Sequence, residues 1–441
     1  MFKLFLLYSI IYFCRTGDYI PFVGKLSLLD TVRHELLVAV LVLMAIIFSD
    51  VAKKNLAAAF QNGAWKAFSF FVLLGFLSIP LSVWPGYAFS QFIDFFKLFL
   101  FGIMIVSCIR TEEEFNKYIV LYIICMLYVA ADPLLNYLSG HFMVDHSGGV
   151  DTYRAFSNIL FYRNPNVLAI TLLQCLPFIY YKIAYNGFFA QKLKNGIWAA
   201  AILLIVFIVI VTGSRGGFLV LAGLAFFISY RSPYRKLAML SGIILGIVMW
   251  SMMDPEYQHR FETITQMGES DTSAENRILG LEHGFAMLKE HPILGVGIGC
   301  YPVARWHMFH TSLWAHNLPG QLMGDLGILG TVTFVVFLFK CFKNTRETRK
   351  ILLDNGAGKS LLYYQSMALD ASLFGQIING IGQHSLYLYG FYVIGAMTVV
   401  LLRVTEARLK EQKPKEVDSE KNTNHRLLFP PHTVKRSIPP A

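Results

Sequence analysis

Long runs of apolar residues alternate with short polar connections along most of this 441-residue chain. A helix needs about 20 apolar residues to cross a bilayer, and shorter runs are tolerated where protein surrounds them. Runs of this kind predict helices near 2–14, 35–49, 67–83, 91–109, 117–131, 167–185, 195–212, 217–230, 237–253, 319–342, 361–380 and 384–403. The pattern predicts an all-α, polytopic membrane bundle of about twelve transmembrane helices over residues 1–404.

The composition excludes an ordinary water-soluble protein. Hydrophobic residues make up 55% of the chain and charged residues only 15%, whereas soluble surfaces require far more charge. The net charge of +10 does not indicate nucleic-acid binding, because the lysines and arginines gather in short connections and in the tail. That distribution is typical of cytoplasmic loops. We therefore expect a lipid bilayer, and no nucleic acid, as a partner.

The basic residues fall in alternate connections, which predicts the orientation of the bundle. The connections predicted to be cytoplasmic contain Lys53, Lys54, Lys66, Arg110, Lys117, Lys182, Lys192, Lys194, Arg231, Arg235, Lys236, Lys340, Lys343, Arg346, Arg349, Lys350 and Lys359. Both termini are then cytoplasmic, and the loops 132–166, 213–216 and 254–318 face outward. The first outward loop, which contains Arg15, Lys25 and Arg33, is an exception to the rule. Residues 405–441 are rich in Lys, Glu and Pro and predict a disordered cytoplasmic tail.

The outward loop 254–318 is the longest polar insertion, and its pattern predicts a folded segment. Thr272-Ser273-Ala274-Glu275 is typical of a helix N-terminus, and Pro292 ends the helix. One helical face between them is apolar: Ile278, Leu281, Phe285 and Leu288. We expect this face to lie on the membrane surface or on the mouth of the bundle, with Arg277 directed across the same mouth.

The segment Ser214-Arg215-Gly216-Gly217 interrupts two apolar runs. A lone arginine is costly when it faces lipid, so Arg215 should face the bundle interior, water or an anion. An arginine that extends to the interface is the alternative. The two flanking glycines favour a backbone that bends around a ligand.

The loop 132–166 contributes two further arginines, Arg154 and Arg163, and ends in Asn164-Pro165-Asn166. Asn-Pro-Asn is typical of a turn and a helix cap, and ligand contact is the alternative role.

His316 and Asn317 directly precede a predicted helix. A histidine at a membrane interface is often a hydrogen-bonded structural residue, but its ordinary pKa also suits it to accept a hydroxyl proton. His307 and His310 lie nearby, yet they lack the usual spacing of metal ligands, and no Asp-x-Asp pair is present. The six cysteines are scattered through apolar runs and indicate neither disulfides nor a metal site. We therefore expect no metal and no cofactor.

Several short motifs together resemble the bacterial O-antigen ligase and O-antigen polymerase superfamily. In chain order they are Ser214-Arg215-Gly216-Gly217, Asn276-Arg277, His291-Pro292-x-x-Gly295-Val296-Gly297-x-Gly299, His316-Asn317 and Gly324-Asp325-Leu326-Gly327-Ile328-Leu329-Gly330. The resemblance covers residues 150–335, including Asn164-Pro165-Asn166. Two positions depart from the pattern: Asp325 stands where the family often has Glu, and residues 281–283 where an aromatic residue is common.

The resemblance implies a metal-independent, inverting glycosyltransferase in the bacterial inner membrane. Such an enzyme passes a glycan from undecaprenyl diphosphate to a hydroxyl of lipid A-core or a similar acceptor at the periplasmic face. Arg215 and Arg277 would bind the diphosphate, with Arg154, Arg163 and Arg260 as secondary candidates. His316 would orient or deprotonate the acceptor hydroxyl, and Asn317 would position it. The substrate-binding candidates also include Asn164, Asn166 and Ser214.

Three alternatives remain open from the sequence. A polymerase of O-antigen, exopolysaccharide or capsule and a protein O-oligosaccharyltransferase share the donor chemistry. A transporter or flippase of lipid-linked saccharide belongs to a different class and predicts charges at the membrane midplane together with repeat symmetry. Asp94, Lys97 and Asp370 lie within apolar runs and keep this alternative open, although no internal repeat is visible.

Overall fold

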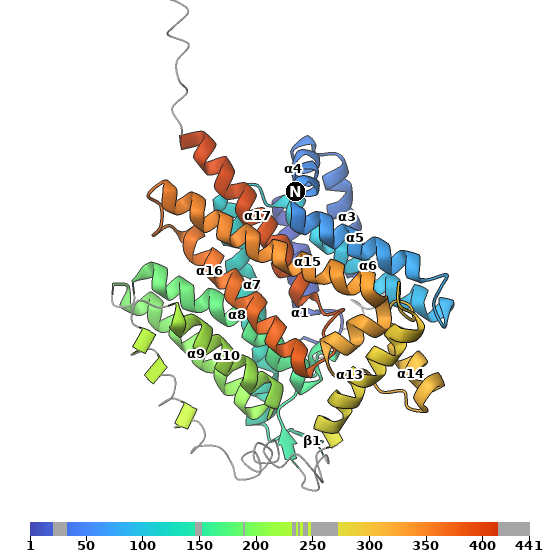
Figure 1. Ribbon diagram of the computed structural model, residues 1–441. Coiled ribbons are helices and arrows are strands. Elements are labelled where there is room, and N and C mark those ends of the chain that lie inside the picture. Colours follow the sequence, from blue (N-terminus) through green and yellow to red (C-terminus); the bar gives the residue numbers. More distant parts are fainter. Residues whose placement is uncertain are drawn as a thin grey trace, which may run out of the picture.

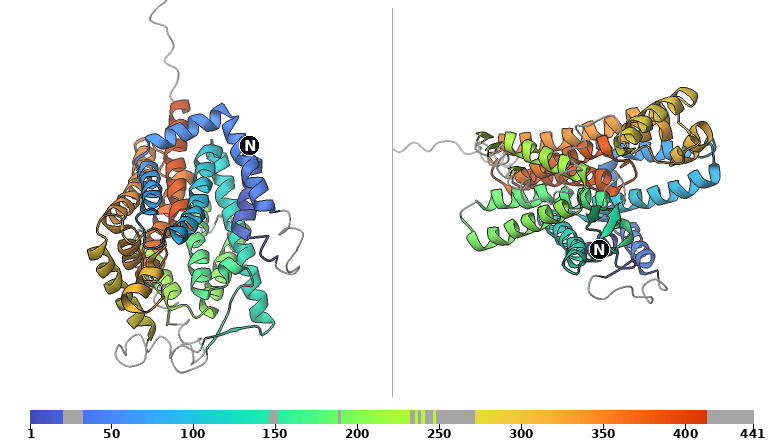
Figure 2. Two further views of the ribbon diagram at one scale, coloured as in Figure 1. Left: turned by 90° about the vertical axis from the view of Figure 1, so that its right-hand side faces the viewer. Right: turned by 90° about the horizontal axis from the view of Figure 1, so that it is seen from below.

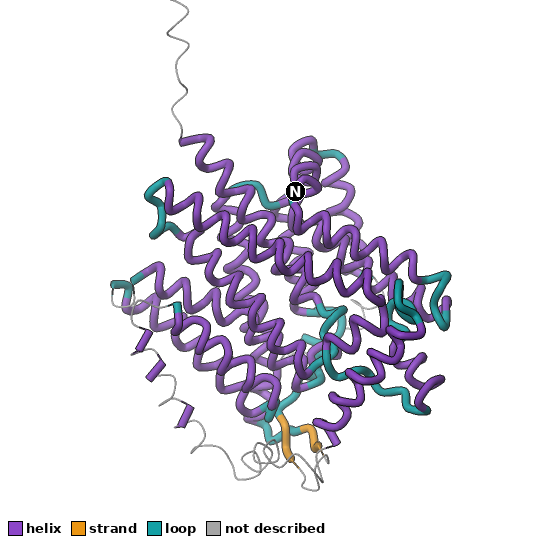
Figure 3. Tube along the Cα trace, viewed as in Figure 1, coloured by secondary structure: helices purple, strands orange, loops and turns teal. Residues whose placement is uncertain are grey.

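The computed structural model describes residues 1–20, 33–145, 152–187, 190–231 and 272–412, together with the short segments 235–236, 239–240 and 246–247. In these parts the chain forms a bundle of packed helices with a pair of short strands, coloured purple and orange in Figure 3. The helices are α1 (Phe2–Cys14), α3 (His34–Ile47), α4 (Asp50–Gln61), α5 (Gly63–Ser78), α6 (Pro85–Cys108), α7 (Glu112–Leu138), η1 (Leu160–Tyr162), α8 (Pro165–Asn186), α9 (Lys192–Val211), α10 (Arg215–Tyr230), α13 (Thr272–Glu290), α14 (Tyr301–Phe309), α15 (Leu318–Asp354), α16 (Leu361–Gly382) and α17 (Tyr389–Gln412). The antiparallel strands are β1 (Met143–Asp145) and β2 (Thr152–Arg154).

Each predicted apolar run coincides with a described helix, except 237–253, nearly all of which lies outside the described residues. Six of these helices, namely α6, α7, α8, α9, α15 and α17, are long and apolar enough to cross a membrane, and the pair α3 and α4, bent by 89°, would make a seventh. The membrane helical bundle is therefore confirmed, whereas the predicted count of about twelve spans is not. The difference arises because α1, α5 and α10 are short and because α16 buries polar residues such as Gln365 and Asp370.

The charged residues within the apolar runs pair with other residues of the protein. The buried Asp370 carboxylate on α16 lies 2.8 Å from both Arg231 and Arg349, so it joins α10 and α15 to α16. The exposed pair Asp94 and Lys97 lies on one face of α6 with 2.7 Å between charged atoms. A buried carboxylate requires such partners because its desolvation is costly.

The bundle has two distinct ends (Figure 1) (Figure 2). At one end α1, α7, α9 and α16 finish and α8, α10, α15 and α17 begin, and we call it the site end. There the chain before α8 bonds to the end of α9, since Ala155 N–H donates to the carbonyl of Val211 over 2.8 Å. At the opposite end Arg403 donates to the carbonyl of Val106 over 2.6 Å, and Arg408 pairs with Glu112 over 2.8 Å.

Helix α13 crosses the start of α15 with its backbone almost in contact (Figure 1). A Cβ atom at Gly280 would lie 1.8 Å from the carbonyl oxygen of Ala315, and one at Gly284 would lie 2.3 Å from that of Gly320. The predicted helix is thus present, but its glycine face packs on the bundle. The apolar stripe is exposed: Ile278 56%, Leu281 44% and Phe285 50%. The stripe therefore does not cover the mouth of the bundle, because the glycine face approaches more closely than branched side chains allow. Its placement on the membrane surface, the other predicted possibility, stays a prediction.

Helix α15 is broken at Gly327, whose backbone adopts φ 61° and ψ −157°. The segment His291–Cys300, which we call the glycine loop, replaces the helical hydrogen bonds that the break removes. Ile328 N–H donates to the carbonyl of Pro292 over 2.9 Å, and Val296 N–H donates to that of Gly324 over the same distance. The alternating glycines allow the loop to adopt this backbone path, since Gly295, Gly297 and Gly299 all have positive φ.

The last described helix extends into the predicted tail. Helix α17 continues to Gln412, so a disordered segment cannot begin at residue 405. Residues 413–441 lie outside the described residues.

Candidate functional site

The crossing of α13 and α15 brings three of the predicted site residues together. Asn317 caps α15, because its Oδ1 accepts from Gly320 N–H over 2.6 Å. Its Nδ2 donates to the carbonyls of Arg277 over 2.7 Å and Ala315 over 3.0 Å. Asn317 therefore fixes the backbone on both sides of His316 and ties it to the turn of α13 that carries Arg277.

His316 lies in a left-handed conformation with φ 53° and faces an imidazole that the sequence did not point to. Its ring centroid lies 5.4 Å from that of His384, which itself stacks on Trp314 at 5.2 Å. Burial, and then the positive charges of Arg277 and Arg305, lower the pKa of His316. Burial, and then His316, lower the pKa of His384 to about 4. Both rings are accordingly neutral at pH 7 and able to accept a proton.

Arg305 on α14, which sequence analysis also missed, holds the loop that carries His316. Its side chain is 1% exposed and donates to the carbonyls of Leu313 and Trp314 over 3.2 and 3.1 Å. Its Nε donates to Nδ1 of His283 over 2.8 Å. Burial lowers the pKa of Arg305. Nothing in the local sequence distinguishes it from an exposed arginine, because its partners come from other elements.

The segment 383–388, which joins α16 to α17, forms another wall of the site. Arg277 Nε donates to the carbonyl of Gly382 over 3.3 Å. Leu386 N–H donates to the side chain of Gln321 over 3.1 Å, and Tyr387 donates to the Asp325 carboxylate over 3.0 Å. In the sequence this connection stood out only by its lack of lysine and arginine.

The second group of predicted residues lies next to the N-termini of α8 and α10 and stabilises them. Arg154 donates to the carboxylate of Asp145 over 2.9 Å, to Oδ1 of Asn166 over 2.9 Å and to the carbonyl of Thr212 over 2.7 Å. The guanidinium is 7% exposed, so Arg154 and Asn166 cross-link the chain in this region. Asn164 caps α8 and Ser214 caps α10, each through a hydrogen bond to a backbone N–H.

Arg215, the first residue of α10, is half-buried. Helix α10 packs antiparallel to α16, because Gly223 approaches Ile378 whereas Arg231, at the end of α10, pairs with Asp370 earlier in α16. Arg215 and the Gly382 contact of Arg277 therefore lie at the same end of α16. Arg163 is exposed just before α8, and Arg260 lies outside the described residues.

Helix N-termini and helix C-termini both meet at the site end, so its backbone attracts anions only at the individual N-termini. Helices α8, α10, α15 and α17 all begin there, and a helix N-terminus attracts anions through its partial positive charge and unpaired N–H groups. Among the described residues no group of three or more His, Cys, Asp or Glu side chains is arranged to hold a metal ion.

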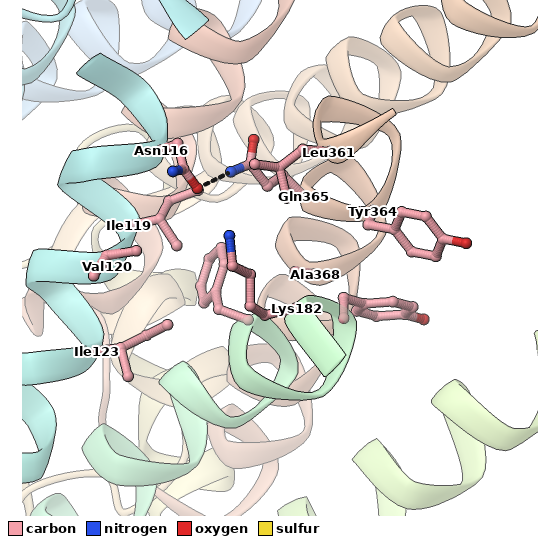
Figure 4. Close-up of a pocket in the computed structure, with 11 residues that line it drawn as sticks. Asn116, Ile119, Val120, Ile123, Lys182, Leu361, Tyr364, Gln365 and Ala368 are labelled. Atoms are coloured by element: carbon pink, nitrogen blue, oxygen red, sulfur yellow. Dashed lines mark hydrogen bonds between the residues drawn. The ribbon is translucent and has the colours of Figure 1, made fainter. Parts of the chain in front are cut away.

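A separate small cleft lies between α7, α8 and α16 (Figure 4). Lys182 extends into it toward Asn116 and Gln365, which hydrogen-bond each other over 3.3 Å. Because the cleft lies where α7 and α16 begin and α8 ends, it belongs to the end opposite the site.

The fold and the site define an integral membrane protein with arginines, neutral histidines and helix N-termini gathered at one end. Residues 200–335 match the family model described as O-antigen ligase. This match contains Arg215, Arg277, His316 and Asn317, and it confirms the resemblance to the O-antigen ligase superfamily. The chain is thus similar to the O-antigen ligase family over residues 200–335. The comparison with curated proteins gives no match.

Proposed function

We propose that this protein transfers a glycan from undecaprenyl diphosphate to an acceptor hydroxyl, of lipid A-core or a similar molecule, without a metal ion and with inversion. The observation that carries the proposal is the placement of Arg277 beside a neutral His316, both fixed by the side chain of Asn317. An anion-binding group and a proton acceptor are the two functions that this reaction requires.

Arg277 and Arg215 would stabilise the leaving group. Negative charge develops on the diphosphate as the bond between the anomeric carbon and the phosphate oxygen breaks. A guanidinium remains charged at every relevant pH and binds two phosphate oxygens at once. The N-termini of α10 and α15 would add to this stabilisation. Arg163 and Arg260 remain secondary candidates, whereas the hydrogen bonds of Arg154 favour a structural role.

His316 would act as the base. The acceptor oxygen forms its bond to the anomeric carbon on the face opposite the diphosphate, and the hydroxyl proton passes to the neutral imidazole. Direct displacement of this kind inverts the anomeric configuration. Asn317 would position His316 through the backbone, since its side chain is occupied by its cap and its two carbonyl contacts.

We further propose that the site end faces the periplasm of a bacterial inner membrane and that both termini are cytoplasmic. The support is that segments rich in lysine and arginine lie at the opposite end, such as the connection at Arg110 and the last turns of α15 from Lys343 onward.

The test is incubation of purified protein with lipid-linked oligosaccharide and, separately, with lipid A-core, a second lipid-linked repeat unit or a protein acceptor. We expect glycan transfer to lipid A-core, no transfer by His316→Ala, and unchanged transfer in the presence of a chelator. A ladder of longer lipid-linked chains would instead identify a polymerase, and a modified protein would identify an O-oligosaccharyltransferase. Absence of transfer to every acceptor would contradict the proposal.

A further inference from the structure

Arg15, at the site end of α1, is a cation with an unusual environment. Its guanidinium carbon lies 5.0 Å from the ring centroid of Tyr12 and 4.7 Å from that of Phe161. The side chain is half-buried, and its Nε is fully buried without a hydrogen-bond partner. Aromatic faces attract a cation, but they provide no acceptor for its N–H groups.

Within the described part of the chain, no acidic side chain forms an ion pair with this guanidinium. Asp18 and Glu35 are the acidic residues in its neighbourhood, yet no ion pair joins either of them to Arg15 within the described part of the chain. A charge that is partly removed from water without a partner is costly. An anion that is not part of the protein would remove this cost.

Arg15 is connected to the candidate site through aromatic side chains. Phe161 stacks on Tyr389 with 5.8 Å between centroids, and Tyr12 meets the same ring edge-on at 6.1 Å. Tyr389 follows directly on the segment 383–388 that carries His384. A small cavity lined by Phe161 and Tyr389 also exposes polar side chains, namely Thr171, Gln174 and Gln376.

We propose that Arg15 is a further oxyanion-binding residue of this protein, besides Arg215 and Arg277, and that it takes a phosphate group. Tyr12 and Phe161 hold the guanidinium in place, and its N–H groups donate to the phosphate oxygens. The location extends the binding region from Arg277, along segment 383–388, to the end of α1. The inference rests on the proposed function in one respect, because that function supplies a phosphate-bearing lipid at this end of the bundle.

The experiment measures the melting temperature and Kd of the purified full-length protein with inorganic phosphate, with undecaprenyl phosphate and with uncharged undecaprenol. Arg15→Met is compared with Arg33→Met, because Arg33 is exposed, lies on the same side and also has a positive φ of 45°. We expect Arg15→Met to weaken phosphate binding by about 10-fold or more and Arg33→Met to leave it unchanged. A response to both phosphate probes shows that a free anion suffices, and a response to undecaprenyl phosphate alone shows that the lipid is required.

A structural role for Arg15 predicts a different pattern. Removal of an unpaired buried charge should not lower the melting temperature in the absence of a probe, so a lower melting temperature with unchanged binding would overturn the proposal. Arg277→Met separates it from the proposed function. If only Arg277→Met loses binding, the Arg15 site is wrong and the proposed function stands. If only Arg15→Met loses binding, the Arg15 site stands and the diphosphate role of Arg277 is wrong.

Discussion

The imidazole of His316 lies edge-on to the imidazole of His384, with 5.4 Å between the ring centroids and 78° between the ring planes. His384 is separated from His316 by a complete hairpin of α15 and α16. A positive charge on His316 therefore disfavours one on His384, in a place where Arg277 is already cationic and lowers the pKa of His316.

The pH dependence of transfer should follow from the lowered pKa of His316. Its base form is lost as the pH falls through this pKa, which lies below the ordinary value of 6.5. Transfer should consequently persist below pH 6.5 and decline only in more acidic solution. The Arg277→Gln variant lacks one cause of the lowered pKa, so its residual activity should decline at a higher pH. Rates measured from pH 4 to 8 test this, and an acidic decline centred above pH 6.5 in the wild type would contradict it.

Arg215 and Arg277 should not be replaceable by lysine. Lys retains the charge but loses the planar, bidentate donor geometry, so each variant should transfer glycan about 10²–10³-fold more slowly. Arg346→Lys, an exposed position at the opposite end, serves as the control and should have wild-type rates. Wild-type rates in both site variants would contradict the proposed binding of the diphosphate by Arg215 and Arg277.

The two functions of Asn317 should be separable by substitution. Asn317→Asp retains the oxygen that caps α15 but loses the donors to the carbonyls of Arg277 and Ala315. Asn317→Ala loses both and should be destabilised by about 1–3 kcal/mol. We expect the Asp variant to be the more stable of the two in thermal unfolding and both variants to transfer slowly.

The control is Asn164→Asp, because the recorded hydrogen bond of that side chain is the cap of α8. It should be close to wild type in stability. Wild-type transfer by Asn317→Asp would show that the link to Arg277 does not contribute to the reaction.

Gly280 should tolerate no larger residue. A Cβ there would overlap the carbonyl oxygen of Ala315 at 1.8 Å, so Gly280→Ala should displace α13 and destabilise the protein by about 1–3 kcal/mol or more. Gly196 in α9 has no atom within 4 Å of its added Cβ, and Gly196→Ala should be neutral or stabilising by about 0.5–1 kcal/mol. Equal melting temperatures for the two variants would contradict the close crossing.

The sequence predicted the helices well because their signal is local. A run of apolar residues has one stable arrangement in a bilayer, and the runs at 2–14 and 361–380 coincide with α1 and α16. The number of spans was less predictable. Short helices such as α5, and the bent pair α3 and α4, depend on neighbouring helices for burial. The sequence of one segment alone does not reveal these neighbours.

The candidate site was predictable only where short motifs marked it. Arg277, His316 and Asn317 lie in such motifs, and the structure brings them together. His384 and Arg305 escaped notice because their importance arises from contacts with residues distant in the sequence. The face of α13 that packs on the bundle was not foreseen for a related reason, since glycines without side chains allow a closer helix crossing than larger residues do.

The break at Gly327 divides α15 into two mechanical units. The turns before the break carry Asn317 and accept hydrogen bonds from the glycine loop, through the carbonyls of Gly324 and Asp325. The first turn after the break donates to the same loop, since Ile328 N–H bonds to the carbonyl of Pro292. The glycine loop therefore clamps the two units together, and a shift of this loop would act on both of them, including the turns that carry Asn317.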